Sequence, residues 1–168
     1  AAMSGEAAMS RDNTEVSTAP EGPERPEFDV AALRSTPMLA GGPWRRIDAV
    51  AETGSTNADL IAAGVAGEPG GRVLLAEFQN GGRGMLDRAW SSPPRADLLF
   101  SVLVDCAGVP TARWSWLPLL TGLAVRDAVR AATDLDAALK WPNDVLIGDE
   151  AQEGIVGRKV CGILVQTV

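Results

Sequence analysis

The sequence predicts an α+β fold in which a mixed or antiparallel sheet is flanked by helices. The chain has 168 residues and is 46% hydrophobic, which is enough for one domain with a core of its own. Apolar runs of strand length occur between stretches with helical spacing. Two of these runs, 72–78 and 97–105, follow each other without an intervening helix, which favours antiparallel pairing.

Each predicted element has a local signal. The predicted helices cover 28–36, 57–66 and 113–132. The predicted strands cover 44–52, 72–78, 97–105, 137–141, 144–148 and 159–168. Ser55 or Thr56 would cap the second helix and Gly67 would end it, while Pro118 is tolerable near the first turn of the third. The segment 148–158 is predicted to form an extended hairpin.

Charge and composition exclude several classes of protein. Of the net charge of −7, residues 1–30 contribute −5. Residues 1–27 show no apolar period and are predicted to be a disordered acidic segment ahead of a folded domain over 28–168. We expect a cytoplasmic protein that binds neither DNA nor a membrane, because no basic face, membrane-length apolar run or signal peptide is suggested. The lack of histidine excludes His-based triads and His metal sites, and two cysteines are too few for a disulfide framework.

Three polar stretches could form a ligand site, and the first is FQNGGRGMLDRAW, residues 78–90. Its glycines would let a ligand approach the backbone, and Arg83 and Arg88 would suit an anion. A flexible surface loop explains the same residues at least as well. Neither a Walker lysine pattern nor G-x-G-x-x-G occurs in it, so the standard phosphate-binding loops are excluded.

The other two stretches are TGSTN, residues 53–57, and KWPND, residues 140–144. The first places three small polar side chains at a helix start, which suits a neutral polar ligand but is also ordinary capping. The second ends in Asn143 and Asp144, which could contact a nucleotide and a metal ion or could simply form a turn.

In this order and spacing, the motifs resemble those of the biotin protein ligases (biotin–[acetyl-CoA-carboxylase] ligases). The motifs are S-T-N, Q-x-x-G-R-G…R-x-W, K-W-P-N-D and K-x-x-G-I-L, and the similarity extends from about Trp44 to Val168. The resemblance implies a catalytic domain like that of class II aminoacyl-tRNA synthetases. It also implies a ligase that uses ATP and magnesium to make biotinyl-5′-AMP and then transfers biotin to a lysine of a biotin carboxyl carrier domain.

Site residues follow from this resemblance by position. The biotin-binding residues would be Ser55, Thr56, Asn57, Gln79, Gly82, Arg83 and Lys159. The residues that bind ATP and the adenylate would be Arg83, Arg88, Trp90, Lys140, Asn143 and Asp144. Lys159 and Arg83 would be catalytic, and Asp144 is the candidate magnesium ligand. We expect Ser55, Gln79, Arg83 and Lys159 to line one cavity.

The use of lysine suits that chemistry. Lys140 and Lys159 are the only lysines in a chain that has thirteen arginines. When a carboxylate attacks a phosphate, two anions meet, and a compact ammonium on a flexible stem can follow the moving charge more readily than a planar guanidinium. We therefore expect Lys159 to be lysine because of its site.

The chain also departs from the family pattern. Met85, Leu86 and Asp87 stand where the family continues with basic residues and a glycine, which predicts weaker retention of the adenylate. The sequence resembles a partial catalytic domain without a winged helix or a C-terminal SH3-like domain. Three alternatives stay open: a lipoate or octanoyl transferase of the same fold, a non-catalytic biotin-binding module, and an α+β domain without a ligand.

Overall fold

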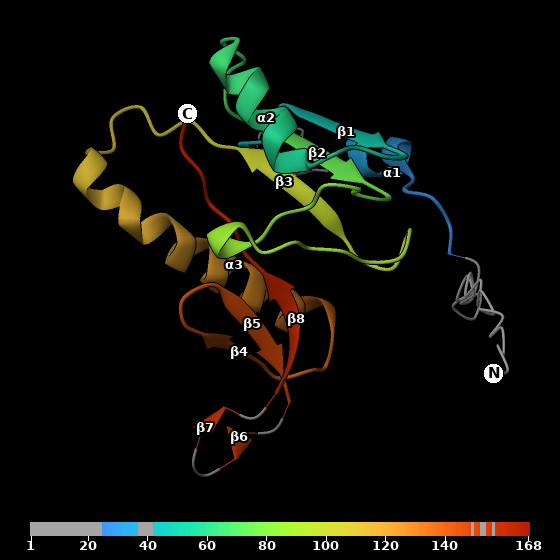
Figure 1. Ribbon diagram of the computed structural model, residues 1–168, viewed down its shortest axis with the longest axis vertical. Helices are drawn as coiled ribbons and strands as arrows, with labels where there is room; N and C mark the ends of the chain where they lie inside the picture. Colours follow the sequence, from blue (N-terminus) through green and yellow to red (C-terminus); the bar gives the residue numbers. More distant parts are fainter. Residues whose placement is uncertain (1–24, 37–41, 149, 152–153, 156) are drawn as a thin grey trace, which may run out of the picture.

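The computed structural model describes residues 25–36, 42–148, 150–151, 154–155 and 157–168. They form two three-stranded sheets with helices packed on them, and one short hairpin (Figure 1). The predicted α+β class is confirmed, with both parallel and antiparallel strand pairs. Among the described helices, none has the length and hydropathy needed to cross a membrane. Residues 1–24, which we predict to be disordered, lie outside the described part of the chain.

The first sheet combines parallel and antiparallel pairing. Its strands, in spatial order, are β1 (Arg46–Val50), β2 (Arg72–Ala76) and β3 (Leu99–Leu103). β1 and β2 are parallel because the helix α2 (Thr56–Val65) returns the chain between them, whereas β2 and β3 are antiparallel. Leu60 of α2 and Leu74 of β2 are both buried, so the helix covers an apolar face of this sheet.

The second sheet is antiparallel throughout. Its strands, in spatial order, are β4 (Ala137–Lys140), β5 (Asp144–Ile147) and β8 (Arg158–Gly162). The helix α3 (Leu117–Ala132) packs on β4 and β5, as the lower half of Figure 1 shows. Its Val125 and Val129 contact a buried core of Ala137, Val145 and Ile163.

Two predicted boundaries are wrong. The third helix, expected from residue 113, begins at Leu117, because Thr111–Trp116 form the 3₁₀ helix η2. Pro118 sits in the first turn, the one place in an α-helix where its missing N–H costs nothing. The last strand, expected to run to residue 168, ends at Gly162, and the remaining residues leave the sheet.

The C-terminal segment 163–168 returns to the first sheet, as the red trace in Figure 1 shows. There Asn57 Nδ2 donates to Gln166 Oε1 at 2.6 Å, and Val168 lies against Gly64 of α2. The remaining elements fall within predicted ranges. They are α1 (Val30–Arg34), β6 (Glu150–Ala151) and β7 (Gly154–Ile155), the last two forming the expected hairpin.

Candidate functional site

The start of α2 is joined to the end of β2 by a buried polar cluster. Thr56 is 3% exposed, and both its backbone N–H and its hydroxyl donate to Gln79 Oε1, at 2.7 and 3.0 Å. The same hydroxyl lies 2.8 Å from the hydroxyl of Ser101 on β3. Ser55 is the N-cap of α2 and accepts a long hydrogen bond, 3.4 Å, from the backbone of Ala58. The predicted cap is therefore Ser55, while Thr56 holds Gln79 in place.

Residues 79–94, here called the glycine-rich loop, fold back on themselves between β2 and β3. The N–H of Trp90 donates to the carbonyl of Gly82 at 2.9 Å, and Gly84 N donates to Arg88 O at 2.7 Å. A Cβ on Gly82 would lie 2.7 Å from the Trp90 carbonyl oxygen and 3.2 Å from Gln79 Nε2. Only glycine fits there, so the loop brings its own backbone onto the Gln79 side chain.

Trp90 joins this loop to β8. The ammonium of Lys159 lies over the Trp90 ring, 5.2 Å from its centroid, and 2.7 Å from Asp144 Oδ1. A Cβ on Gly162 would lie 3.1 Å from Lys159 Nζ and 3.3 Å from the Trp90 ring. Trp90 Nε1 is buried and has no hydrogen-bond partner among the described residues, so it remains available to an acceptor.

An irregularity in β8 gives Lys159 its direction. Asp144 pairs with Gly162 and Val145 with Cys161, but Leu146 then pairs with Lys159, so Val160 is an extra residue. Paired residues of neighbouring strands lie on the same face, and a bulge re-aims side chains at such points. The bulge thus moves Lys159 away from the face of Val145, which is fully buried, and onto the face of Asp144.

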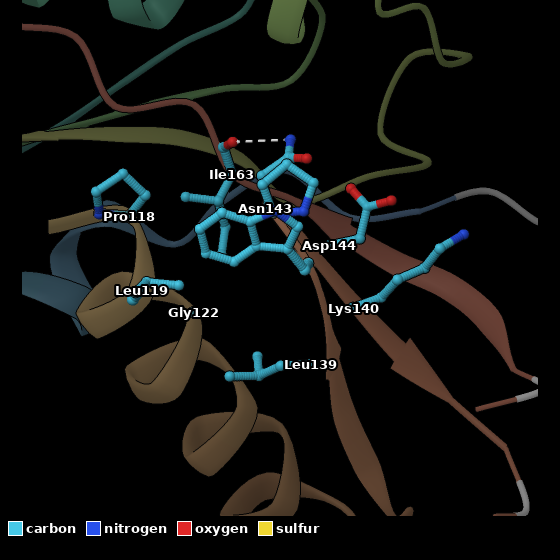
Figure 2. Close-up of a pocket in the computed structure, with 10 residues that line it drawn as sticks. Pro118, Leu119, Gly122, Leu139, Lys140, Asn143, Asp144 and Ile163 are labelled. Carbon is cyan, nitrogen blue, oxygen red and sulfur yellow. Dashed lines mark hydrogen bonds between the residues drawn. The ribbon is translucent and has the colours of Figure 1, made fainter. Parts of the chain in front are cut away.

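The turn after β4 lies next to a small apolar cavity of about 180 Å³ beside α3, drawn in Figure 2. Asn143 is fixed by two hydrogen bonds to Ile163. Its side-chain Nδ2 donates to the Ile163 carbonyl at 3.1 Å, and its main-chain carbonyl accepts from Ile163 N at 2.8 Å. Lys140 is exposed at the cavity rim, across the strand pair from Asp144. Two predicted nucleotide-binding residues, Asn143 and Asp144, therefore lie beside Lys159 and Gly162.

The two predicted arginines of the glycine-rich loop form no side-chain hydrogen bond or ion pair with the residues described above. Arg83 and Arg88 are exposed, and their guanidinium groups form no hydrogen bond or ion pair within the described residues. The 3₁₀ turn η1 (Met85–Asp87) lies between them, and both Leu86 and Asp87 have left-handed backbones, with φ of 57° and 55°. Glycine is favoured in that region, so Asp87 stands at a position whose backbone suits glycine.

The expectation of one shared cavity is not met by the two cavities described. A larger one, about 650 Å³, opens between β3, α3 and the C-terminal segment. Neither it nor the smaller cavity is lined by Ser55, Gln79, Arg83 or Lys159. Instead, direct contacts connect a series of neighbouring residues. The series is Thr56, Gln79, Gly82, Trp90, Lys159 and Asp144.

Comparison with known proteins identifies the family of this chain. Residues 54–168 match the biotin/lipoate A/B protein ligase family. The chain belongs to this family. It is 44% identical over 146 residues to a biotin–[acetyl-CoA-carboxylase] ligase of Mycobacterium tuberculosis, covering 84% of this chain and 52% of the relative. A ligase of the same name from Paracoccus denitrificans is 35% identical over 120 residues, covering 70% and 45%.

Among solved structures, the biotin protein ligase from Aquifex aeolicus in complex with biotin and ATP has a fold similar to that of this chain. The TM-score is 0.59 at 31% identity, covering 74% of this chain and 47% of the other. The chain therefore spans about half the length of the relatives it matches.

Of two neighbours of the series, Ser101 was not predicted, and Cys161 was expected only as a small core residue. Ser101 is a lone hydroxyl in the apolar strand 97–105, and that polar interruption was the signal for it. Cys161 lies next to the bulge; burial raises the pKa of its thiol, an effect that Lys159 only partly opposes. The thiol therefore stays protonated at neutral pH, and Cys161 serves as a packing residue rather than a nucleophile.

Proposed function

We propose that this chain contains the part of a biotin protein ligase that binds biotin and forms biotinyl-5′-AMP. The contact series from Thr56 to Asp144 supports the proposal, because it joins a neutral hydrogen-bonding cluster to a cation. Biotin has the same two parts, a neutral ureido ring and a carboxylate. Within 25–36, 42–148, 150–151, 154–155 and 157–168, no other predicted set joins these two kinds of group.

The neutral end would hold the ureido ring. Gln79 and Thr56 hold each other in fixed orientations, so the Gln79 amide and the Gly82 backbone are preorganised to recognise an uncharged polar ligand. Ser55 and Asn57 are half-buried at the same helix start and would add polar contacts. A dithiolane ring such as that of lipoate has no ureido N–H or C=O for these groups to satisfy.

The charged end would hold the reacting groups. A biotin carboxylate oxygen attacks the α-phosphorus of ATP and pyrophosphate leaves; the carrier lysine amine then attacks the acyl carbon and AMP leaves. Lys159 is already held as an ammonium between Asp144 and the Trp90 ring, where it would neutralise the two approaching anions. Arg83 and Arg88 would turn inward onto the phosphate, and Trp90 would lie beside the adenine.

Magnesium would fit at Asp144 as an ion held largely by phosphates. Asp144 Oδ1 is buried and accepts no aligned hydrogen bond, although it lies in ion-pair contact with Lys159. The described residues contain no group of three or more His, Cys, Asp or Glu side chains placed to hold a metal. Mg²⁺ is commonly bound by one carboxylate, water and substrate phosphates, where it neutralises phosphate charge.

The proposal extends to the carrier and the compartment. The acceptor would be a lysine of a biotin carboxyl carrier domain, and the reaction would take place in the cytoplasm. The test is biotin-dependent ATP–pyrophosphate exchange together with calorimetry using biotin and lipoate. Exchange with biotin supports the ligase, whereas biotin binding without exchange would make the chain a binding module. Preferential binding of lipoate would overturn the substrate assignment.

A further inference from the structure

Residues 25–28 contact the polypeptide at both ends of the glycine-rich loop, although they precede the residues that match the family. Ahead of the loop, the N–H of Phe28 donates to Glu77 Oε1 at 2.7 Å, and Glu77 is only 9% exposed. Directly after the loop, the guanidinium of Arg95 pairs with Glu27 at 2.7 Å. Arg95 and Arg25 also form two hydrogen bonds of 3.3 Å. The Arg95 guanidinium donates to the main-chain carbonyl of Arg25, and the main-chain carbonyl of Arg95 accepts from the Arg25 guanidinium.

The two ends of the loop are also joined to each other. The N–H of Arg95 donates to the carbonyl of Glu77 at 2.8 Å, which closes the base of the loop. Arg95 has φ of 59°, a left-handed conformation that non-glycine residues adopt only when their surroundings hold them in it. Contacts to residues 25–28 on its side chain and its carbonyl supply that support.

The same segment is anchored on its other side. At the end of α1, Arg34 donates to the carbonyl of Ile47 at 2.8 Å and pairs with Asp48 at 3.1 Å, both on β1. In Figure 1, α1 lies beside β1. Residues 25–28 are therefore fixed to the sheet and can restrain the loop base.

We propose that residues 25–28 are a clasp that holds the base of the glycine-rich loop, with Glu27 and Arg95 as positioning residues for ligand binding. This inference rests on the proposed function only in naming biotin as the ligand. A loop whose two ends are fixed has fewer conformations to lose when a ligand binds, so the clasp would favour the arrangement of Gly82 and Trp90 seen here.

The test is a charge exchange in the full chain. Glu27→Arg and Arg95→Glu each place like charges together, and the double variant restores an ion pair with the opposite polarity. We expect each single variant to speed amide hydrogen exchange in 79–94 by roughly three- to tenfold and to raise the biotin Kd by about two- to fivefold, since exposed ion pairs are weak. The double variant should return both quantities to within about twofold of the wild-type chain.

The matched control is the Arg130–Asp136 ion pair at the end of α3, which is comparably exposed. Swapping its two charges, Arg130→Glu with Asp136→Arg, should leave amide hydrogen exchange in 79–94 unchanged. Unchanged loop exchange in Glu27→Arg and Arg95→Glu, or no recovery in their double variant, would overturn the clasp. Faster loop exchange in a protein that binds no biotin would uphold the clasp and refute the proposed function, so the two failures are distinguishable.

Discussion

Lys159 is the residue on which the proposed chemistry most directly depends. Its ammonium fits between Asp144, the Trp90 ring and Gly162, where a single added Cβ would already lie 3.1 Å away. We expect Lys159→Arg to lower pyrophosphate exchange by about 100-fold despite the retained charge, because the larger planar group cannot occupy the same point. Steady-state exchange assays check this. Arg158→Lys, at the exposed neighbouring position, serves as the control, and Lys159→Arg activity above a third of wild type would contradict the expectation.

Gly82 offers a second test at the level of one atom. In Gly82→Ala, the new methyl group would meet the Trp90 carbonyl at 2.7 Å and push the loop off Gln79. We expect biotin affinity to fall by about tenfold or more, with a loss of unfolding free energy on the order of 1 kcal/mol, measured by calorimetry and urea unfolding. Gly84→Ala is the matched control, since its methyl group would meet only Arg88 O, at 3.7 Å. Equal affinities of the two variants would argue against a close loop.

At the scale of elements, η1 tests the effect of the unusual loop sequence. Met85→Arg with Asp87→Gly should slow the dissociation of biotinyl-5′-AMP, because it adds a cation, removes an anion and places glycine at a φ of 55°. Stopped-flow dissociation measures this. Asp87→Asn separates the causes, since it removes the charge while keeping a side chain that tolerates a left-handed backbone. Dissociation rates equal to that of the wild-type chain would refute the idea.

Asp48 on β1 ties neighbouring elements together through Arg34, Arg46 and Arg72. Burial alone would raise its pKa, but hydrogen bonds and charge attraction from Arg46 and Arg72 outweigh this and hold the pKa below its ordinary value. A lowered carboxyl pKa stabilises the fold above the unfolded-state pKa, and the stabilisation is lost as pH falls through the folded-state value. Asp48→Asn should therefore cost about 1 kcal/mol in urea unfolding at pH 7 and progressively less below about pH 4. A cost independent of pH would contradict this.

Much of the element pattern could be predicted because it is local. Apolar runs mark the strands, and Ser55 marks the start of α2. The direction of Lys159 could not be predicted, because regular alternation in β8 would place it on the face of Cys161, and the bulge at Val160 reverses this. The contact of Glu27 with Arg95 joins residues 68 apart and leaves no local pattern. Motif spacing predicts the site residues, while tertiary packing determines which of them meet.

At the scale of the whole molecule, β3 is an edge strand of the first sheet among the described residues. Exposed apolar side chains lie on this strand and directly before and after it. Leu98 is 65% exposed, Phe100 47% and Val104 55%. An edge strand with apolar side chains adds strands from other chains readily. We expect the 168-residue chain to self-associate with rising concentration, and Phe100→Lys to suppress this in sedimentation velocity. Val65→Lys, at an exposed helical position, should not. A wild-type chain that stays monomeric at high concentration would contradict the expectation.

The return of the C-terminal segment to α2 has a mechanical consequence. The chain passes from one half of the molecule to the other after β3 and comes back after β8, where Gln166 binds Asn57 and Val168 covers Gly64. The half that contains the first sheet and the half that contains the second are thus connected twice. One connection is the chain between β3 and β4, and the other is the strap formed by the side chains of the C-terminal segment on α2. Melting of either sheet would release the strap and deprive the other half of its cover, so the two should lose their structure in a single cooperative step.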